Sequence, residues 1–151
     1  MADRAVLAGQ LGQSRLDLLE VLTRVPDDAW GPGQWGVREV LAHLAAWDTA
    51  SATTVNALRV GQPTPPVVVD EDAFNRAAVE EVAALSPQQV MVRLHMARAQ
   101  LVAAVSQAGD LGEFQFPWDD RGTLERMVRG LVYHEREHTA EVRAQYGRDA
   151  G

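Results

Sequence analysis

The sequence contains no cysteine, and this absence excludes several kinds of site at once. Disulfide bonds, thiolate-bound zinc, iron–sulfur clusters and a cysteine nucleophile all require that side chain. Any metal that this chain binds must therefore be held by nitrogen or oxygen ligands. A chain without cysteine also fits a reducing compartment.

Long apolar runs and a surplus of positive charge are lacking as well. The longest nearly apolar segment, Val40 to Trp47, is far too short to cross a bilayer, and residues 1–13 do not have the pattern of a secretory leader. We therefore expect a cytoplasmic protein with no membrane partner. The net charge is −7 and the arginines are scattered, so a phosphate backbone would be repelled and nucleic acid is not an expected partner.

An alternating strand pattern is missing outside the brief valine run at 67–69, whereas four long segments have helical periodicity. A chain of 151 residues with 46% hydrophobic side chains has the size and composition of one globular domain. We find no internal repeat that would divide it. The sequence therefore predicts one all-α domain over residues 1–151, a four-helix bundle with one extra short helix in the crossover, in an up-down-down-up or similar order.

Local signals place the ends of the helices. Ser86 and Gln89 form a capping-box pattern around a proline, and Thr123 is a typical N-cap. Apolar residues on the first helix, including Val6, mark its expected buried side. The predicted helices run from near Asp3 to about Arg24, from near Gly36 toward Gly61, over the short stretch 73–84, from Pro87 to about Gln107, and from Thr123 onward.

The last helix contains the pattern His-Glu-x-x-His, with His134 and His138 on one face. Positions four apart in a helix can direct two ring nitrogens at one ion, about 2.0–2.1 Å from each. In a zinc protease Glu135 would be the general base, and a third ligand would follow on another element. Only residues 139–151 follow, Glu141 is too close on the same helix, and no sheet edge is expected to align a peptide. We therefore do not favour a protease.

A third ligand can instead come from upstream. His43 lies at the edge of the apolar stripe of the second helix, where it could complete a three-histidine site or be a core-edge imidazole bonded to a carbonyl. A di-iron site is not expected, because neither His43 nor His95 follows an acidic residue by three positions. We interpret His95 as structural.

Three pieces of the chain resemble the DinB/YfiT-like superfamily of metal-binding four-helix bundles. These are Ala29-Trp30, the stretch from Trp35 to Leu44, and His134 with His138. Gly36 stands where these proteins usually have serine, so the second helix lacks a capping hydroxyl. The resemblance implies a divalent ion, zinc or nickel, held by His43, His134 and His138 with open positions for water or substrate.

The resemblance also implies a function. Relatives include transferases and isomerases that use low-molecular-weight thiols such as bacillithiol, mycothiol or glutathione, as well as some hydrolases, and the family's name records DNA-damage induction, a stress response. We therefore hypothesise an enzyme that transfers a small thiol to an electrophilic small molecule. The alternatives are a metal-dependent hydrolase of a small molecule and a non-catalytic small-molecule-binding module.

Three further residues are candidates near such a site. Glu135 or Glu137 could orient a ligand or shuttle a proton, or both could be solvated surface charges, which is the interpretation we favour for Glu137. Trp47 could form a wall of the substrate pocket, although tryptophans in bundles are often core residues. The chain could also form a homodimer, through an apolar helix face that is not buried within the bundle.

Overall fold

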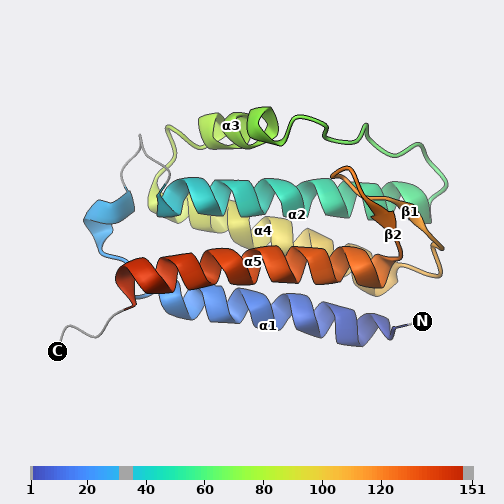
Figure 1. Ribbon diagram of the computed structural model, residues 1–151, viewed down its shortest axis with the longest axis horizontal. Coiled ribbons are helices and arrows are strands. Elements are labelled where there is room, and N and C mark those ends of the chain that lie inside the picture. The colour runs from blue at the N-terminus through green and yellow to red at the C-terminus, as the bar shows by residue number, and fades with distance from the viewer. Residues whose placement is uncertain (1, 31–35, 148–151) are drawn as a thin grey trace.

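The computed structural model describes residues 2–30 and 36–147, and these are arranged as a helical bundle (Figure 1). Its four long helices are α1 (Arg4–Leu22), α2 (Val37–Arg59), α4 (Pro87–Gln107) and α5 (Leu124–Tyr146). The extra short helix, α3 (Glu71–Glu81), lies between α2 and α4 in the chain, and a 3-10 helix, η1 (Asp27–Trp30), precedes α2. The predicted all-α bundle is confirmed. Trp35 and the residues beside it, 31–34, lie outside the described residues.

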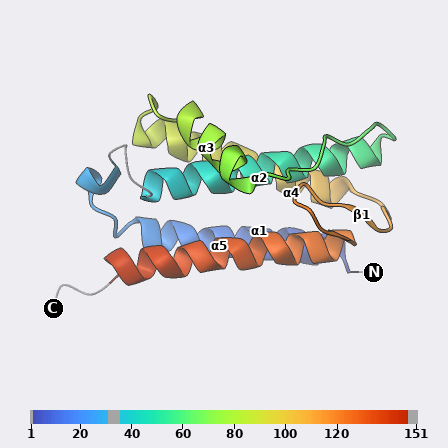
Figure 2. The same cartoon turned by 45° about the horizontal axis from the view of Figure 1, so that its top comes forward.

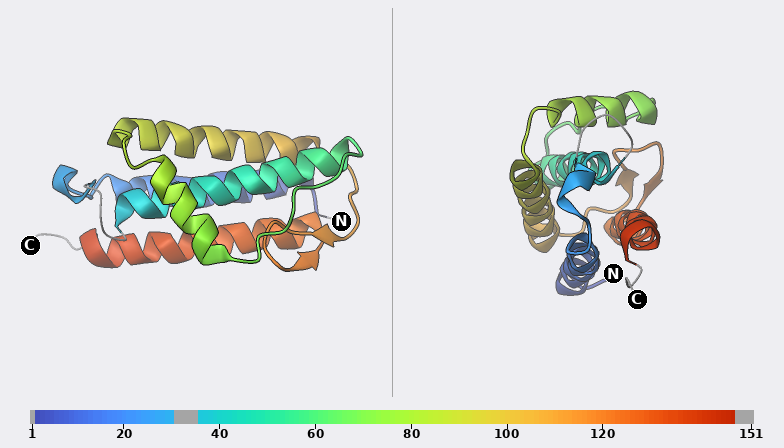
Figure 3. Two further views of the ribbon diagram at one scale, coloured as in Figure 1. Left: turned by 90° about the horizontal axis from the view of Figure 1, so that it is seen from above. Right: turned by 90° about the vertical axis from the view of Figure 1, so that its left-hand side faces the viewer.

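The helices follow the up-down-down-up order. In Figure 1, α1 and α5 run in one direction while α2 and α4 run in the other. Helix α1 packs against α5 and α4, α2 packs against α4, and α2 also contacts α5. Figure 2 shows α1 beside α5, and the end-on view in Figure 3 shows α3 outside the bundle, over α2. The crossover between the two parallel helices α2 and α4 is the part that carries α3.

The predicted caps explain most of the helix ends. Ser86 and Gln89 form the reciprocal capping box, and the Thr123 hydroxyl accepts a hydrogen bond from the Arg126 amide. Gly36 is the N-cap of α2 and supplies no side-chain cap, as expected. Helix α3 begins two residues before its predicted start, because the Asp70 carboxylate accepts from the Ala73 amide and caps the helix there.

The core consists of two adjoining apolar clusters along the bundle axis. One cluster is built around Leu11, Val55 and Met127, and the other around Leu18 and Leu41. The expectation that Val6 is buried is wrong, since 54% of its surface is exposed while Leu7, beside it on α1, is buried. The apolar stripe of α1 therefore begins at Leu7. Within the described ranges, no helix combines the length and the hydropathy that a membrane crossing requires.

A small hairpin closes one end of the bundle. Strand β1 (Phe114–Gln115) pairs antiparallel with β2 (Arg121–Gly122), and neither strand was predicted. The turn between the strands carries Trp118, and the amide of Val68 donates to the carbonyl of Pro117 at 2.7 Å. The hairpin and the segment before α3 are thereby joined. This contact brings Trp118 over the bundle, where it becomes part of the site described next.

Candidate metal centre

Three histidines from two helices converge at one point on the bundle. His43 comes from α2, and His134 and His138 come from α5. The Nε2 atom of His134 lies 2.8 Å from Nε2 of His43 and 3.1 Å from Nε2 of His138. One ligand atom from each ring lies within 4.8 Å of the other two, so the group could hold a metal ion. The structure therefore brings together the three histidines that the sequence singled out.

Two of these rings are held by hydrogen bonds at their other nitrogen. The Asn75 side-chain oxygen lies 2.6 Å from Nδ1 of His43 and 3.2 Å from Nε1 of Trp47. Because the indole N–H can only donate, the Asn75 atom that faces it must be the oxygen, and His43 must then also donate through Nδ1. Glu141 accepts from Nδ1 of His138 at 2.9 Å in the same way. Both rings therefore direct an unprotonated Nε2 at His134.

Burial keeps the imidazole rings of His43 and His134 neutral by lowering their pKa. Desolvation lowers the pKa of His43, and the hydrogen bond to Asn75 opposes part of this shift. For His134, desolvation and the neighbouring His43 and His138 lower the pKa to about 4. At neutral pH these rings have the deprotonated form that a metal ligand needs.

The donor set fits a cation. A neutral His134 has at most one proton on Nε2, and it can give that proton to His43 or to His138 but not to both. One of the two short contacts then sets two nitrogen lone pairs against each other at about the distance of a hydrogen bond. A divalent ion bound by all three nitrogens relieves this repulsion, and three neutral imidazoles suit zinc or nickel.

A cavity of about 280 Å³ lies beside two of these histidines. Besides His43 and His134, it is lined by Trp47, Glu71, Trp118, Gly130, Leu131, Tyr133 and Glu137. The rings of Trp47 and Trp118 meet edge to face, with centroids 6.0 Å apart and planes at 78°. A Cβ atom at Gly130 would come within 3.2 Å of the Trp118 ring, so the glycine allows the indole to lie against α5. Trp47 is therefore in the wall of the cavity, as proposed from the sequence.

Glu135 does not face these histidines, and the alternative that it is a solvated surface charge is wrong. Its side chain is fully buried on another face of α5, where it accepts hydrogen bonds from Ser14, Arg15 and Arg98. Both arginines also contact Asp48, at 3.0 and 2.8 Å. Neighbouring positions on a helix point about 100° apart, which places Glu135 inside the bundle while His134 faces α2.

Other residues have simpler roles. Glu137 is exposed and lines the cavity, and His95 is exposed on α4, away from the histidine cluster. Asn75 was missed from the sequence, since it lies in no recognisable motif, and of the tryptophans that could wall a pocket only Trp47, and not Trp118, was given a site role. Arg15 and Arg98 did carry a signal, because each interrupts an apolar stripe: Arg15 lies between Leu11 and Leu18, and Arg98 between Leu94 and Leu101.

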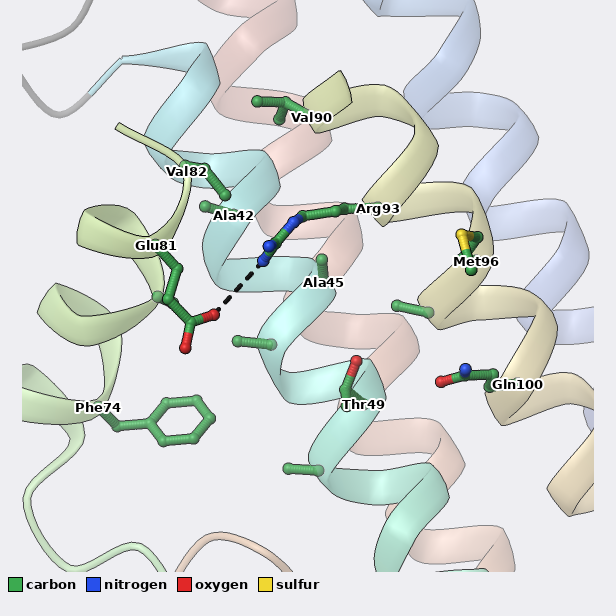
Figure 4. A pocket seen from close by; sticks show the side chains of 14 residues that line it. Ala42, Ala45, Thr49, Phe74, Glu81, Val82, Val90, Arg93, Met96 and Gln100 are labelled. Atoms are coloured by element: carbon green, nitrogen blue, oxygen red, sulfur yellow. Dashed lines mark hydrogen bonds and ion pairs between the residues drawn. The ribbon is translucent and has the colours of Figure 1, made fainter. Parts of the chain in front are cut away.

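A larger hollow, of about 420 Å³, lies between α2, α3 and α4 (Figure 4). Its floor is made largely of alanines from α2, and the ion pair between Glu81 and Arg93 spans it at 3.4 Å. It contains no histidine and no cluster of metal ligands among its lining residues. The smaller cavity beside the histidines is therefore the better candidate for chemistry.

Comparison with protein families shows the family of this chain. The family description "DinB superfamily" matches residues 10–142, which is most of the chain. The chain belongs to the DinB superfamily. No curated protein matches it by sequence.

Three solved structures, of two proteins, share the fold of this chain. An uncharacterised protein from Escherichia coli UTI89 superposes with a TM-score of 0.72 at 15% identity, over 95% of this chain and 92% of that one. Mycothiol-dependent maleylpyruvate isomerase and a histidine-to-alanine mutant of it also superpose with a TM-score of 0.72, at 16% identity. These alignments cover 94% of this chain but only 63% of the isomerase.

Proposed function

We propose that this chain is a metal-dependent enzyme that transfers a low-molecular-weight thiol to an electrophilic small molecule. The observation that carries the proposal is the convergence of three histidine Nε2 atoms beside a cavity walled by two tryptophans. His43, His134 and His138 would hold a divalent ion, zinc or nickel. When bound, such an ion lowers the pKa of a thiol or of water beside it.

The chain's own residues supply the other requirements. Asn75 and Glu141 hold His43 and His138 with Nε2 directed inward, which sets the ligand geometry before an ion arrives. Trp47 and Trp118 offer an apolar surface for the body of the electrophile. Since the chain has no cysteine, the sulfur must come from a separate thiol.

One of the similar structures favours a thiol over water as the nucleophile. The isomerase with this fold depends on mycothiol, so mycothiol is the first thiol to test. Because this chain spans only 63% of that protein and is 16% identical to it, the isomerase reaction itself is not part of the proposal.

The test is the reaction of 1-chloro-2,4-dinitrobenzene with mycothiol, bacillithiol or glutathione, in the presence of zinc or nickel. The S–H proton passes to solvent, the C–Cl bond breaks, an S–C bond forms and chloride is released. We expect conversion above the uncatalysed rate only when protein, metal and thiol are all present. His43→Ala should remove the activity, whereas His95→Ala, which changes an exposed histidine away from the cluster, should retain it.

Two outcomes would overturn the proposal in different directions. Conversion that requires metal but proceeds equally well without thiol would indicate a hydrolase. Binding of metal without turnover, across all three thiols and several electrophiles, would indicate a small-molecule-binding module.

A further inference from the structure

The walls of the cavity beside the histidines have an unusual balance of charge. The charged side chains that line it are the carboxylates of Glu71, from α3, and Glu137, from α5. No arginine is among the lining residues, and the chain has no lysine, since all 14 of its basic side chains are arginine. The aromatic part of the lining comes from Trp47, Trp118 and Tyr133.

Two of the arginines beside the cavity on α5 are already paired with other carboxylates, and Arg136, next to Glu137, is exposed and does not line the cavity. Arg129, one turn before Tyr133, donates to Glu125 at 2.8 Å. Arg126, one turn before Gly130, contacts Asp120 at 3.1 Å. A carboxylate ligand would therefore enter a cavity with two negative groups and, among the described residues that line it, no arginine to bind it.

Aromatic faces beside carboxylates are the surroundings that an organic cation prefers. An ammonium group is attracted electrostatically to the face of tryptophan or tyrosine, and the negative charges of Glu71 and Glu137 add to that attraction. An uncharged aromatic molecule gains the apolar contact without the charge term. The same two glutamates repel an anion, so the cavity discriminates against anionic ligands.

We propose that this cavity binds small aromatic or unsaturated molecules in the order cationic, then uncharged, then anionic, and so selects against carboxylate substrates. The inference rests on the proposed function only in taking this cavity as the substrate site. It separates the chain from the relative named above, because maleylpyruvate is a carboxylate anion at neutral pH. The two proteins would share a fold and differ in the charge of what they bind.

The experiment compares three probes with one ring and different charge: benzyltrimethylammonium, benzyl alcohol and phenylacetate. Binding is measured by calorimetry with the full chain as purified, and again after chelation of metal. Chelation is needed because a bound divalent ion would itself attract a carboxylate and hide the effect of the cavity walls. With the chelated protein we expect the cation to bind about tenfold or more tightly than phenylacetate, with benzyl alcohol between them.

Variants assign the preference to particular side chains. The double variant Glu71→Gln/Glu137→Gln should bind the cation about tenfold more weakly, bind phenylacetate more tightly, and leave benzyl alcohol unchanged. Glu80→Gln is the matched control, because it removes the same charge from an exposed position of α3 that does not line the cavity. It should leave the order and size of the preference unchanged.

Three results would overturn the inference: phenylacetate binding the chelated parent as tightly as the cation, a preference that survives in the double variant, or no binding of any probe. None of these measurements uses a thiol or turnover. A failure of charge selection is therefore distinguishable from a failure of the proposed reaction, which is judged by metal- and thiol-dependent conversion.

Discussion

Two clusters of titratable side chains both include residues of α2 and α5, and they differ in whether their members satisfy one another. Asp48 on α2 and Glu135 on α5 meet two arginines inside the bundle, where two positive charges balance two negative ones. The other cluster consists of His43, His134 and His138. His43 lies five residues before Asp48 on α2, and His134 lies one residue before Glu135 on α5. There, three ring nitrogens meet without enough protons to bond them all.

The difference separates a structural cluster from a binding site. The buried charges are completed by side chains from all four long helices, so the network fixes how those helices pack and needs nothing from outside. His43 and His138 are bonded at Nδ1 and direct Nε2 at His134, which can supply at most one proton, so the three Nε2 atoms together point to a cation. Residues that are adjacent in the sequence thus belong to sites of opposite kinds.

Breaking the buried network should have the largest effect on stability. Arg98→Met leaves Asp48 and Glu135 sharing one arginine in the interior, and loss of one partner from such a buried group costs about 3–5 kcal/mol. The measurement is the free energy of unfolding from urea denaturation. Arg93→Met is the control on the same helix, because its partner Glu81 is exposed and the pair should contribute less than about 1 kcal/mol. Equal losses in both variants would contradict this interpretation of the network.

Breaking the histidine cluster should remove the metal and spare the fold. We expect one divalent ion per chain in protein purified without a histidine tag, and almost none in His138→Ala, because two remaining imidazoles hold an ion weakly. Elemental analysis measures the ion, and circular dichroism should show unchanged helix content. Full metal occupancy in the variant would mean that the ligands are misassigned.

The sequence predicted the parts of the molecule that depend on local patterns. The start of α4 followed from Ser86, Pro87 and Gln89, and the pairing of His134 with His138 followed from helical spacing. His43 entered the set because the resemblance and the apolar stripe of α2 agreed. These features depend on neighbours within one turn or on a motif that is written in order along the chain.

What could not be predicted depends on contacts between distant segments. Asn75 reaches His43 only because α3 folds back over α2, and Trp118 reaches Trp47 only because an unpredicted hairpin meets residue 68. The buried place of Glu135 was not predicted, because its motif describes the spacing along α5 but not the arginines that α1 and α4 bring to it. Packing, rather than spacing, decides which face of a helix performs which role.

Removing an orienting hydrogen bond should weaken the metal site without abolishing it. In Asn75→Ala, His43 loses the acceptor that fixes its tautomer, and Trp47 loses the same partner. Loss of such a partner typically lowers metal affinity about 10–100-fold. Chelator competition measures the affinity, and Asn56→Ala is a control because the described residues show no hydrogen bond for that side chain. An affinity unchanged from the parent would show that packing alone orients His43.

Acid should destabilise the metal-free protein through the histidines. The pKa of His134 is about 4 in the folded chain and about 6.5 when unfolded, so between these values the unfolded state binds more protons. The stabilising contribution is complete above about pH 6.5 and is lost as pH falls toward 4, by up to about 1.4 kcal/mol per pH unit for one proton. Urea midpoints of the parent and His134→Gln at pH 7 and pH 5 test this, and parallel losses in both proteins would contradict it.

The smallest effect on metal affinity is expected for a change at Glu141. Its side chain accepts a hydrogen bond from Nδ1 of His138, as Asn75 does from Nδ1 of His43. The two acceptors differ in exposure, because 64% of the Glu141 side chain is accessible to water while Asn75 is partly buried and also accepts a hydrogen bond from Trp47. Water can replace an exposed acceptor at little cost, so Glu141→Ala should lower metal affinity by no more than about threefold. Chelator competition at low and high salt measures this, and the difference from the parent should shrink as salt screens the carboxylate. A loss as large as that of Asn75→Ala would show that the carboxylate's charge, rather than the burial of the hydrogen bond, governs how firmly these imidazoles are held.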